Sequence, residues 1–317
     1  MIAVTTRWAG SPAAVDRLGR LLEGGIRRFA VHGQLREDDF ARVRAFLPRE
    51  AFAAVELFAP LPRTLPVGAP SPFRLGSLHP EDRRDALVRG KRSIEEGDAA
   101  GIPLVILPPG SIEKPSTGEV LPLLAKKTPD RVWEALWSAR AASAERQMDS
   151  YRTTLSALLD HADRYGIGLA MVLGGHPAEL PAIDEAARCL EEFRGAPLFL
   201  WADLLSDSRR KRSGGKGAER LRGDLRPHLR GLTVRGSDGE REHLLPSAGE
   251  VDWTEWKDLC EPAAPAKTAV EPFERLWTLD VAPDVADEDL FRARKALEEY
   301  LHGSEKTYEP FSFRRGP

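Results

Sequence analysis

Short runs of Val, Ile, Leu and Phe recur along the chain, and each is followed by a longer stretch in which apolar residues return with helical periodicity. This alternation of strand and amphipathic helix is typical of βα units around a parallel sheet. The runs with the length and composition of buried strands are residues 2–6, 28–32, 53–57, 103–107, 168–172, 197–203, 231–235 and 268–272. Their number is the one that a closed (β/α)8 barrel needs.

The segments between these runs agree with a barrel. Residues 129–166 predict a long helical region before the fifth strand, and residues 287–303 predict an amphipathic helix after the last strand. We therefore expect the α/β class, with a (β/α)8 TIM-barrel fold and an extra C-terminal helix. The barrel forms a single domain over 1–302, followed by a tail at 303–317. An open, doubly wound sheet is the alternative that the pattern leaves open.

Two stretches of biased composition interrupt the alternation. Residues 60–73 are rich in proline and predict a loop after the third strand. Residues 206–223 are basic and rich in glycine, and they predict a solvated loop after the sixth strand, with grip of a phosphate as the alternative. The second stretch lacks interleaved aromatic residues, which disfavours binding of single-stranded nucleic acid.

The composition is that of a soluble globular protein, with 42% hydrophobic and 30% charged residues. The formal net charge is only -3, so no overall field favours binding to nucleic acid or to a membrane. The two cysteines, Cys189 and Cys260, are far apart and predict a reducing compartment. No uninterrupted apolar run reaches the roughly 18 residues that suggest a membrane span. A cytoplasmic protein is the expectation.

Chemistry in a TIM barrel is carried by residues at the C-terminal ends of the strands, because the βα loops gather there. The predicted strand ends place these residues at that face: His32, Glu56, Pro108, Val172, Asp203, Arg235 and Glu271. Three loop residues, His79, His176 and His243, could reach the same face.

Asp203 and Glu271 are the most informative of these residues. A carboxylate that ends an apolar strand is costly to bury unless another group compensates its charge. The functional interpretation is an acid–base pair or a site for a hard cation. The structural interpretation is a salt bridge to Arg235 or to another basic residue.

From about residue 85 to residue 273, the chain resembles the xylose isomerase-like TIM barrels. This superfamily comprises sugar and sugar-phosphate isomerases and epimerases, and it includes apurinic endonucleases. The stretches that carry the resemblance are "LLDHADRYGIGLAMVLGGHPAEL", "FLWADLLSD", "LRGLTVRGSDGEREHLLPSAGEVDW" and "AVEPF". The third is the most specific, with its run from Asp238 through His243 to "GEVDW".

The resemblance implies a divalent metal held by Glu, Asp, His and Glu on strands five to eight, with the two Glu residues moving a proton through an enediolate. Asp203 matches the strand-six Asp, and Glu271 matches the strand-eight Glu. Val172 and Thr233 stand at the other two ligand positions, which implies a degenerate site. We therefore expect either no cofactor or a weakly bound Mn, Mg, Co or Zn ion at Asp203 and Glu271.

Two functions follow. The first is a divergent sugar or sugar-phosphate isomerase or epimerase, with Glu271 and Asp203 as catalytic residues. In this case, the groups around the substrate are His32, Glu56, His176, Arg235 and His243. The second is a non-catalytic barrel, a pseudoenzyme that binds a carbohydrate or phosphorylated ligand or serves as a partner subunit. A DNA-repair nuclease is disfavoured, because its histidine ligands are nearly all missing. The resemblance also implies a homo-oligomer.

Overall fold

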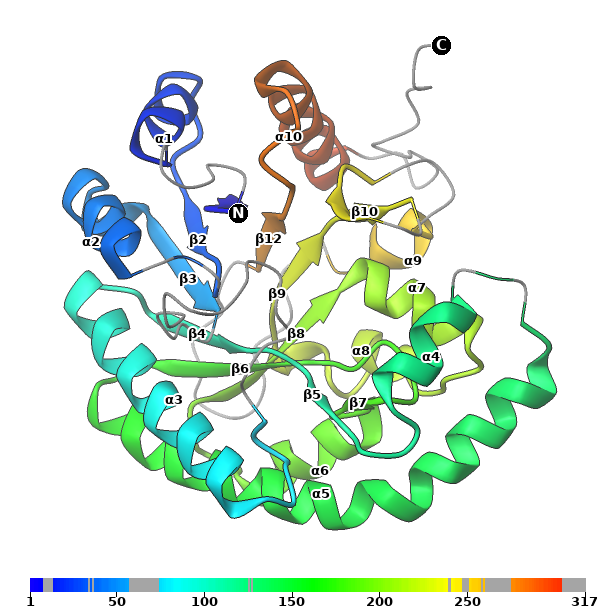
Figure 1. Cartoon of the computed structure of the whole chain (residues 1–317). Coiled ribbons are helices and arrows are strands. Elements are labelled where there is room, and N and C mark those ends of the chain that lie inside the picture. Colours follow the sequence, from blue (N-terminus) through cyan, green and yellow to red (C-terminus); the bar gives the residue numbers. More distant parts are fainter. Residues whose placement is uncertain are drawn as a thin grey trace.

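The chain folds into a closed barrel of parallel strands surrounded by helices (Figure 1). A computed structural model describes residues 1–7, 14–33, 35, 37–56, 74–124, 126, 128–238, 241–246, 251–257, 259 and 275–303. The strands, in the order in which they pair around the barrel, are β1 (Ile2–Thr5), β12 (Leu276–Leu279), β9 (Leu229–Val234), β8 (Leu198–Asp203), β6 (Gly168–Val172), β4 (Leu104–Leu107), β3 (Phe52–Glu56) and β2 (Phe29–Val31). The closed ring confirms the predicted TIM-barrel fold and excludes the open sheet.

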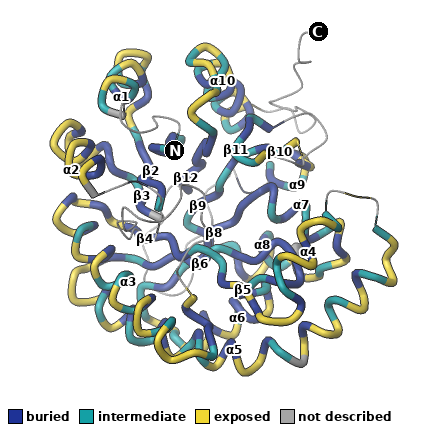
Figure 2. Tube along the Cα trace, viewed as in Figure 1, coloured by how far each residue is buried: buried dark blue, intermediate teal, exposed yellow. Residues whose placement is uncertain are grey.

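The helices pack their apolar faces on the outside of this ring and expose their polar faces, as Figure 2 shows by colour. They are α1 (Ala14–Glu23), α2 (Glu37–Phe46), α3 (Pro80–Ala100), α4 (Thr117–Leu124), α5 (Asp130–Arg164), α6 (Ile183–Glu192), α7 (Leu204–Arg212), α8 (Ala218–Arg222), α9 (Trp253–Lys257) and α10 (Asp287–His302). Both α5 and α10 confirm predicted helices. No helix in the described part of the chain is long and apolar enough to span a membrane.

Two short antiparallel ribbons lie beyond the C-terminal ends of the barrel strands. β5 (Gly110–Ser111) follows β4 and pairs with β7 (Glu179–Leu180), which follows β6. β10 (Gly236–Ser237) directly follows β9 and pairs with β11 (Glu242–Leu244). The ribbons extend the barrel at the end where a TIM barrel carries its site.

The predicted eighth strand is wrong. The strand that closes the barrel between β9 and β1 is β12, whereas 268–272 and Glu271 lie outside the described residues. Both segments are short apolar runs, so periodicity alone does not choose between them. The choice rests on packing, because Trp277 and Leu279 of β12 are 2% and 0% exposed in the main core.

The predicted basic loop at 206–223 is also wrong, because its first part belongs to the helix α7. Asp203 caps this helix, with its Oδ1 accepting the Ser206 backbone N–H at 2.9 Å. Arg210 is 2% exposed; it pairs with Asp207 one turn earlier and donates to the Gly174 carbonyl at 3.0 Å. Basic residues of this stretch therefore belong to a packed helix, because acidic residues one turn away pair with them.

The side chain of Trp201 fills much of the barrel interior and packs directly on Gly231. Trp201 of β8 is 1% exposed and packs in a cluster of small and aliphatic side chains that point inward from other strands. A Cβ atom on Gly231 of β9 would lie 2.3 Å from Cζ3 of this indole and 2.8 Å from the Leu276 carbonyl oxygen. Gly231 is therefore the residue that lets Trp201 lie across the interior.

We predict that Gly231→Ala destabilises the barrel by about 1–3 kcal/mol, because the added methyl group overpacks a rigid indole and a backbone carbonyl. Urea unfolding followed by tryptophan fluorescence measures the change. Gly118→Ala is the matched control, since a Cβ atom there meets nothing within 4 Å. Equal stability of the two variants would contradict the packing of Trp201 on Gly231.

Candidate functional site

A cavity of about 270 Å³ opens at the C-terminal end of the barrel. The described residues that line it are Ile106, Pro108, Pro109, Thr117, Leu121, Val172, His176, Glu179, Trp201, Asp203, Ser206, Arg209, Thr233, Arg235, Glu242, His243 and Asp280. Trp201 contributes from the barrel interior, and both short ribbons contribute to the walls. The cavity thus combines apolar surface with a dense set of charged groups.

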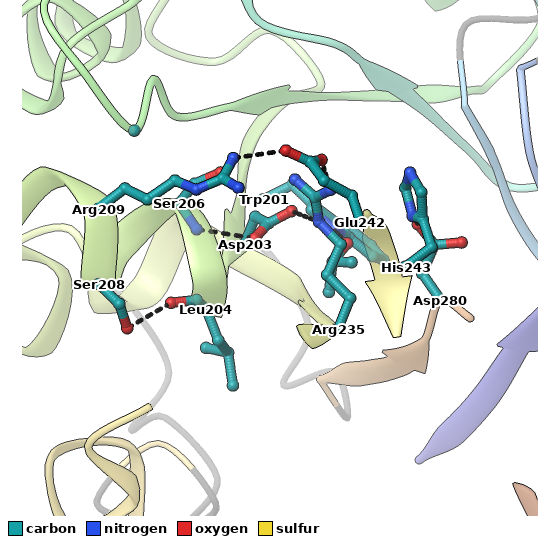
Figure 3. Close-up of polar contacts among 12 residues, drawn as sticks. Trp201, Asp203, Leu204, Ser206, Ser208, Arg209, Arg235, Glu242, His243 and Asp280 are labelled. Atoms are coloured by element: carbon teal, nitrogen blue, oxygen red, sulfur yellow. Dashed lines mark hydrogen bonds and ion pairs between the residues drawn. The ribbon is translucent and has the colours of Figure 1, made fainter. Parts of the chain in front are cut away.

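One wall is a chain of alternating charges (Figure 3). Asp203 ends β8, and its Oδ2 accepts the Arg235 Nε–H at 2.6 Å. Arg235 follows β9 and also donates through Nη1 to Glu242 of β11, whose other oxygen accepts from Arg209 Nη1 at 2.7 Å. Arg209 belongs to α7, the helix that Asp203 caps, so the chain of contacts returns to its starting element.

Within this wall, Glu242 and Arg235 stabilise each other's ionised form. Burial raises the pKa of Glu242, but Arg235 and Arg209 outweigh burial and lower that pKa to about 2. Burial likewise lowers the pKa of Arg235, but Asp203, Glu242 and Asp280 outweigh it and raise the pKa above its usual value. Arg235 is therefore a permanent cation among three carboxylates.

A second polar cluster joins the first and last strands of the barrel. Asp280 follows β12, is 2% exposed and accepts from Thr5 Oγ1 at 2.7 Å and from Arg7 Nε at 2.9 Å. Its Oδ2 atom lies 2.7 Å from Nδ1 of His243 on β11. Burial raises the pKa of Asp280, but Arg7 and the hydrogen bond from His243 outweigh burial and hold the pKa well below its usual range.

His32 is buried beside this cluster and is not among the lining residues. Its Nδ1 lies 2.8 Å from Thr6 Oγ1, and its backbone N–H donates to the same oxygen at 3.1 Å. Burial, and next the charge of Arg7, lower the pKa of His32 to about 3. The imidazole is therefore neutral at physiological pH.

On the far wall, His176 is held by its own loop. The residue is 3% exposed; its Nδ1 accepts the Ala178 backbone N–H at 3.3 Å, and its Nε2 lies 3.4 Å from Glu179 Oε1. The second Glu179 oxygen accepts the Gly175 N–H at 2.7 Å. These contacts order the loop between β6 and β7.

The cavity lining brings together six of the residues that the sequence nominated: Pro108, Val172, His176, Asp203, Arg235 and His243. Glu56 is the last residue of β3, but its side chain is not among those described, and Glu271 lies outside the described residues. The predicted roles of these two therefore stay predictions. The salt bridge from Asp203 to Arg235, which was the structural interpretation, is present.

Sequence reasoning missed Arg209, Glu242 and Asp280. Asp280 carries the signal that nominated Asp203, since it directly follows the apolar run of β12. It was overlooked because the eighth strand was placed eight residues too early, at 268 instead of 276. Arg209 was assigned to a loop, and Glu242 belongs to a ribbon that the sequence analysis did not predict.

The described donors do not fit a divalent metal ion. The oxygens of Asp203 accept from Ser206 and from Arg235, so a guanidinium already stands at this carboxylate. Thr233 is occupied as well, because its Oγ1 accepts from Trp201 Nε1 at 2.8 Å. Among the residues that the structure describes, no group of three or more His, Cys, Asp or Glu side chains could hold a metal.

Known structures share this fold. A D-tagatose 3-epimerase-like protein superposes with a TM-score of 0.63 at 15% identity, covering 95% of this chain and 96% of its own. The 3-keto-D-glucoside 4-epimerase from E. coli superposes with a TM-score of 0.61 at 14% identity, covering 94% of this chain and 98% of its own. The IolI protein in its zinc-bound structure superposes with a TM-score of 0.60 at 12% identity, covering 95% of this chain and 97% of its own. The sequence itself matches no family profile and no curated protein. The chain therefore has the (β/α)8 TIM-barrel fold of these structures, which include sugar epimerases.

We predict that His32 makes the protein sensitive to mild acid. The pKa of His32 is lower in the folded state than the 6.5 of the unfolded state, so below pH 6.5 only the unfolded chain binds this proton. The free energy of unfolding then falls by about 1.4 kcal/mol per pH unit, which gives a loss of roughly 2 kcal/mol between pH 6.5 and 5. Urea unfolding at the two pH values measures this loss.

His32→Gln should flatten this dependence. His228, whose pKa is also lowered by burial, is present in both proteins and cancels in the comparison. Glu242 and Asp280 have lowered pKa values in the folded state, so their protonation destabilises the fold only as the pH falls toward and below their unfolded-state pKa values of 4.5 and 3.8. An equal loss in wild type and variant would show that His32 is protonated in the folded protein.

Proposed function

We propose that the cavity at the C-terminal end of the barrel binds a small, neutral carbohydrate without a metal ion. The observation that carries the proposal is Arg235, a cation built into the position among carboxylates where a metal would otherwise balance their charge. The structures with the same fold include sugar epimerases, which supports a carbohydrate as the ligand class. Turnover of this ligand requires a group that moves a proton.

The size of the cavity favours a monosaccharide. Its volume of about 270 Å³ lies just below the range of roughly 300–1,000 Å³ that is typical for sites of drug-sized ligands. The lining combines apolar groups such as Ile106 and Val172 with carboxylate, guanidinium and imidazole groups. Such a surface suits a sugar, which has C–H faces and a rim of hydroxyl groups that both donate and accept hydrogen bonds.

The charges favour a neutral sugar over a sugar phosphate. Among the described residues, the lining holds four carboxylates, of Glu179, Asp203, Glu242 and Asp280, and two arginines, Arg209 and Arg235. Both arginines are already paired with carboxylates. A phosphate would have to displace one of these pairs inside a negative field, whereas hydroxyl groups can bond to the lone pairs and N–H groups that remain.

Metal independence has a direct test. We predict that 1 mM Mn²⁺ or Zn²⁺ leaves the melting temperature of protein pretreated with a chelator unchanged, because a ligand stabilises a protein only through tighter binding to the folded state. Differential scanning fluorimetry measures the midpoint. Asp203→Asn is the matched variant. A saturable rise in wild type that Asp203→Asn abolishes would contradict the proposal.

Sugar binding is tested by titration calorimetry with D-tagatose, D-fructose, D-xylose, D-glucose and D-fructose 6-phosphate. We expect at least one neutral sugar to bind, and the phosphate ester to bind more weakly than D-fructose. Arg235→Gln should weaken binding about 10–100-fold, because it leaves Asp203 and Glu242 without their shared cation.

Arg194→Gln is the control for this variant, since the Arg194 side chain is 74% exposed and lies on the surface. Circular dichroism at the titration temperature verifies that both variants are folded. Failure of every neutral sugar to bind, or tighter binding of the phosphate ester than of D-fructose, would overturn the proposal.

A further inference from the structure

Among the described residues of the cavity wall, His243 alone combines an imidazole hydrogen-bonded to a carboxylate with a ring nitrogen that has no hydrogen-bond partner. Its Nδ1 lies 2.7 Å from Asp280 Oδ2, and its side chain is 25% exposed at the cavity. No described residue hydrogen-bonds to Nε2. The other histidine of the lining, His176, has a partner on each ring nitrogen.

The partner fixes which nitrogen carries the proton. The Asp280 carboxylate accepts from Thr5, Arg7 and His243, and its side chain is 3% exposed. An ionised carboxylate only accepts hydrogen bonds, so Nδ1 of His243 must donate. In the neutral imidazole, the lone pair then belongs to Nε2, the nitrogen that the described side chains leave unbonded.

The backbone at this residue is strained. His243 has a φ of 63°, the only positive value among the described residues other than glycine. This conformation is unfavourable for a side chain with a Cβ atom, and it persists only where surrounding structure holds it. Here, the β10–β11 ribbon and the bond to Asp280 hold it, and strained residues of this kind cluster at functional sites.

We propose that His243 is a catalytic base, positioned by Asp280, that moves a proton between adjacent carbons of a bound aldose or ketose. The inference rests on the proposed carbohydrate site. It assigns proton transfer to a dyad of residues, His243 of β11 and Asp280, which directly follows β12. Figure 3 shows the two side chains side by side at the edge of the charged wall.

The step balances without an added reactant. Nε2 of neutral His243 takes a proton from the carbon next to the carbonyl, the C–H electron pair forms the C=C bond, and the carbonyl π pair moves to oxygen. The hydroxyl proton on the carbon that lost its hydrogen then passes to the former carbonyl oxygen. The resulting enediolate is negatively charged, and the neighbouring Arg235 cation stabilises that charge. The imidazolium then returns its proton to the former carbonyl carbon, and the carbonyl reforms at the neighbouring carbon.

A single base acts on one face of the sugar. It can carry a proton from one carbon to the next on that face, which interconverts an aldose and a ketose. Inversion of a carbon would require a second group that delivers a proton to the opposite face. The dyad therefore favours aldose–ketose isomerisation over epimerisation.

The test follows deuterium from D2O into sugar carbons by proton NMR, using the sugars that bind in the titration above. We expect incorporation at the carbon next to the carbonyl and formation of the matching aldose or ketose. His243→Asn should lower the exchange rate about 10²–10⁴-fold, the usual contribution of a general base. Asparagine tolerates positive φ, so this variant is expected to keep the β10–β11 ribbon.

Asp280→Asn should lower exchange roughly 10²-fold or more, because the imidazole loses the partner that sets its tautomer. The dissociation constant of the sugar should stay unchanged in this variant, a split that a purely structural role would not give. In His243→Gly, added imidazole should restore part of the exchange. His302→Asn is the matched control, since His302 is exposed at the end of α10.

The outcomes separate the two proposals. If no neutral sugar binds, the carbohydrate site itself fails, and the dyad fails with it. If a sugar binds but shows no exchange above the protein-free rate, only the role of the dyad fails. Exchange that survives in His243→Asn also overturns that role, as does an Asp280→Asn variant that loses binding and exchange in equal measure.

Discussion

The pairing of Arg235 with carboxylates is the interaction on which the C-terminal end of this barrel depends. A buried guanidinium costs several kcal/mol unless carboxylates compensate its charge, and removal of one partner leaves the others uncompensated. Asp203 and Glu242 supply that compensation directly. Because Asp203 also caps α7 and Arg209 of α7 returns to Glu242, one set of charges joins β8, β9, β11 and α7. The cavity wall is consequently built from groups that fix one another.

Buried polar contacts also join the first and last strands of the barrel, β1 and β12, which are neighbours in the closed sheet. β1 lies between β2 and β12, and Asp280 links Thr5, the last residue of β1, and Arg7 to His243, which carries the strained backbone. Most polar groups of the cavity are thereby committed to partners within the protein. In the proposed function, a ligand is recognised by the remaining lone pairs and N–H groups, which suits hydroxyl groups better than a strong anion. Nε2 of His243 has no hydrogen-bond partner among the described residues, which is why the proposal places proton transfer there.

Fold and site chemistry have different physical requirements, which explains how this chain keeps the fold of sugar epimerases at 14–15% identity. The fold needs apolar periodicity and a filled interior, and Trp201 against Gly231 fills it here. Val172 and Thr233 stand at the positions where the resemblance implies a Glu and a His, and both adjoin Trp201. Val172 pairs with it in register, and the Thr233 hydroxyl accepts its indole N–H. At these two positions, the side chains adjoin the indole that fills the barrel interior.

The sequence by itself determined the fold class, seven of the eight strand positions, the long helices and the end of the barrel at which the cavity opens. These follow from periodicity, which is local, and from the geometry of parallel strands, which is general. It also nominated Asp203, Arg235, His176 and His243 as residues of that end. Only the tertiary structure decided that β12 closes the barrel, that α7 is a helix, and that Asp280 and Glu242 belong to the site. Each of these depends on contacts between residues far apart in the chain. A carboxylate at a strand end has the same local pattern whether a metal, a substrate or an arginine neutralises it, and the partner is chosen by packing in three dimensions.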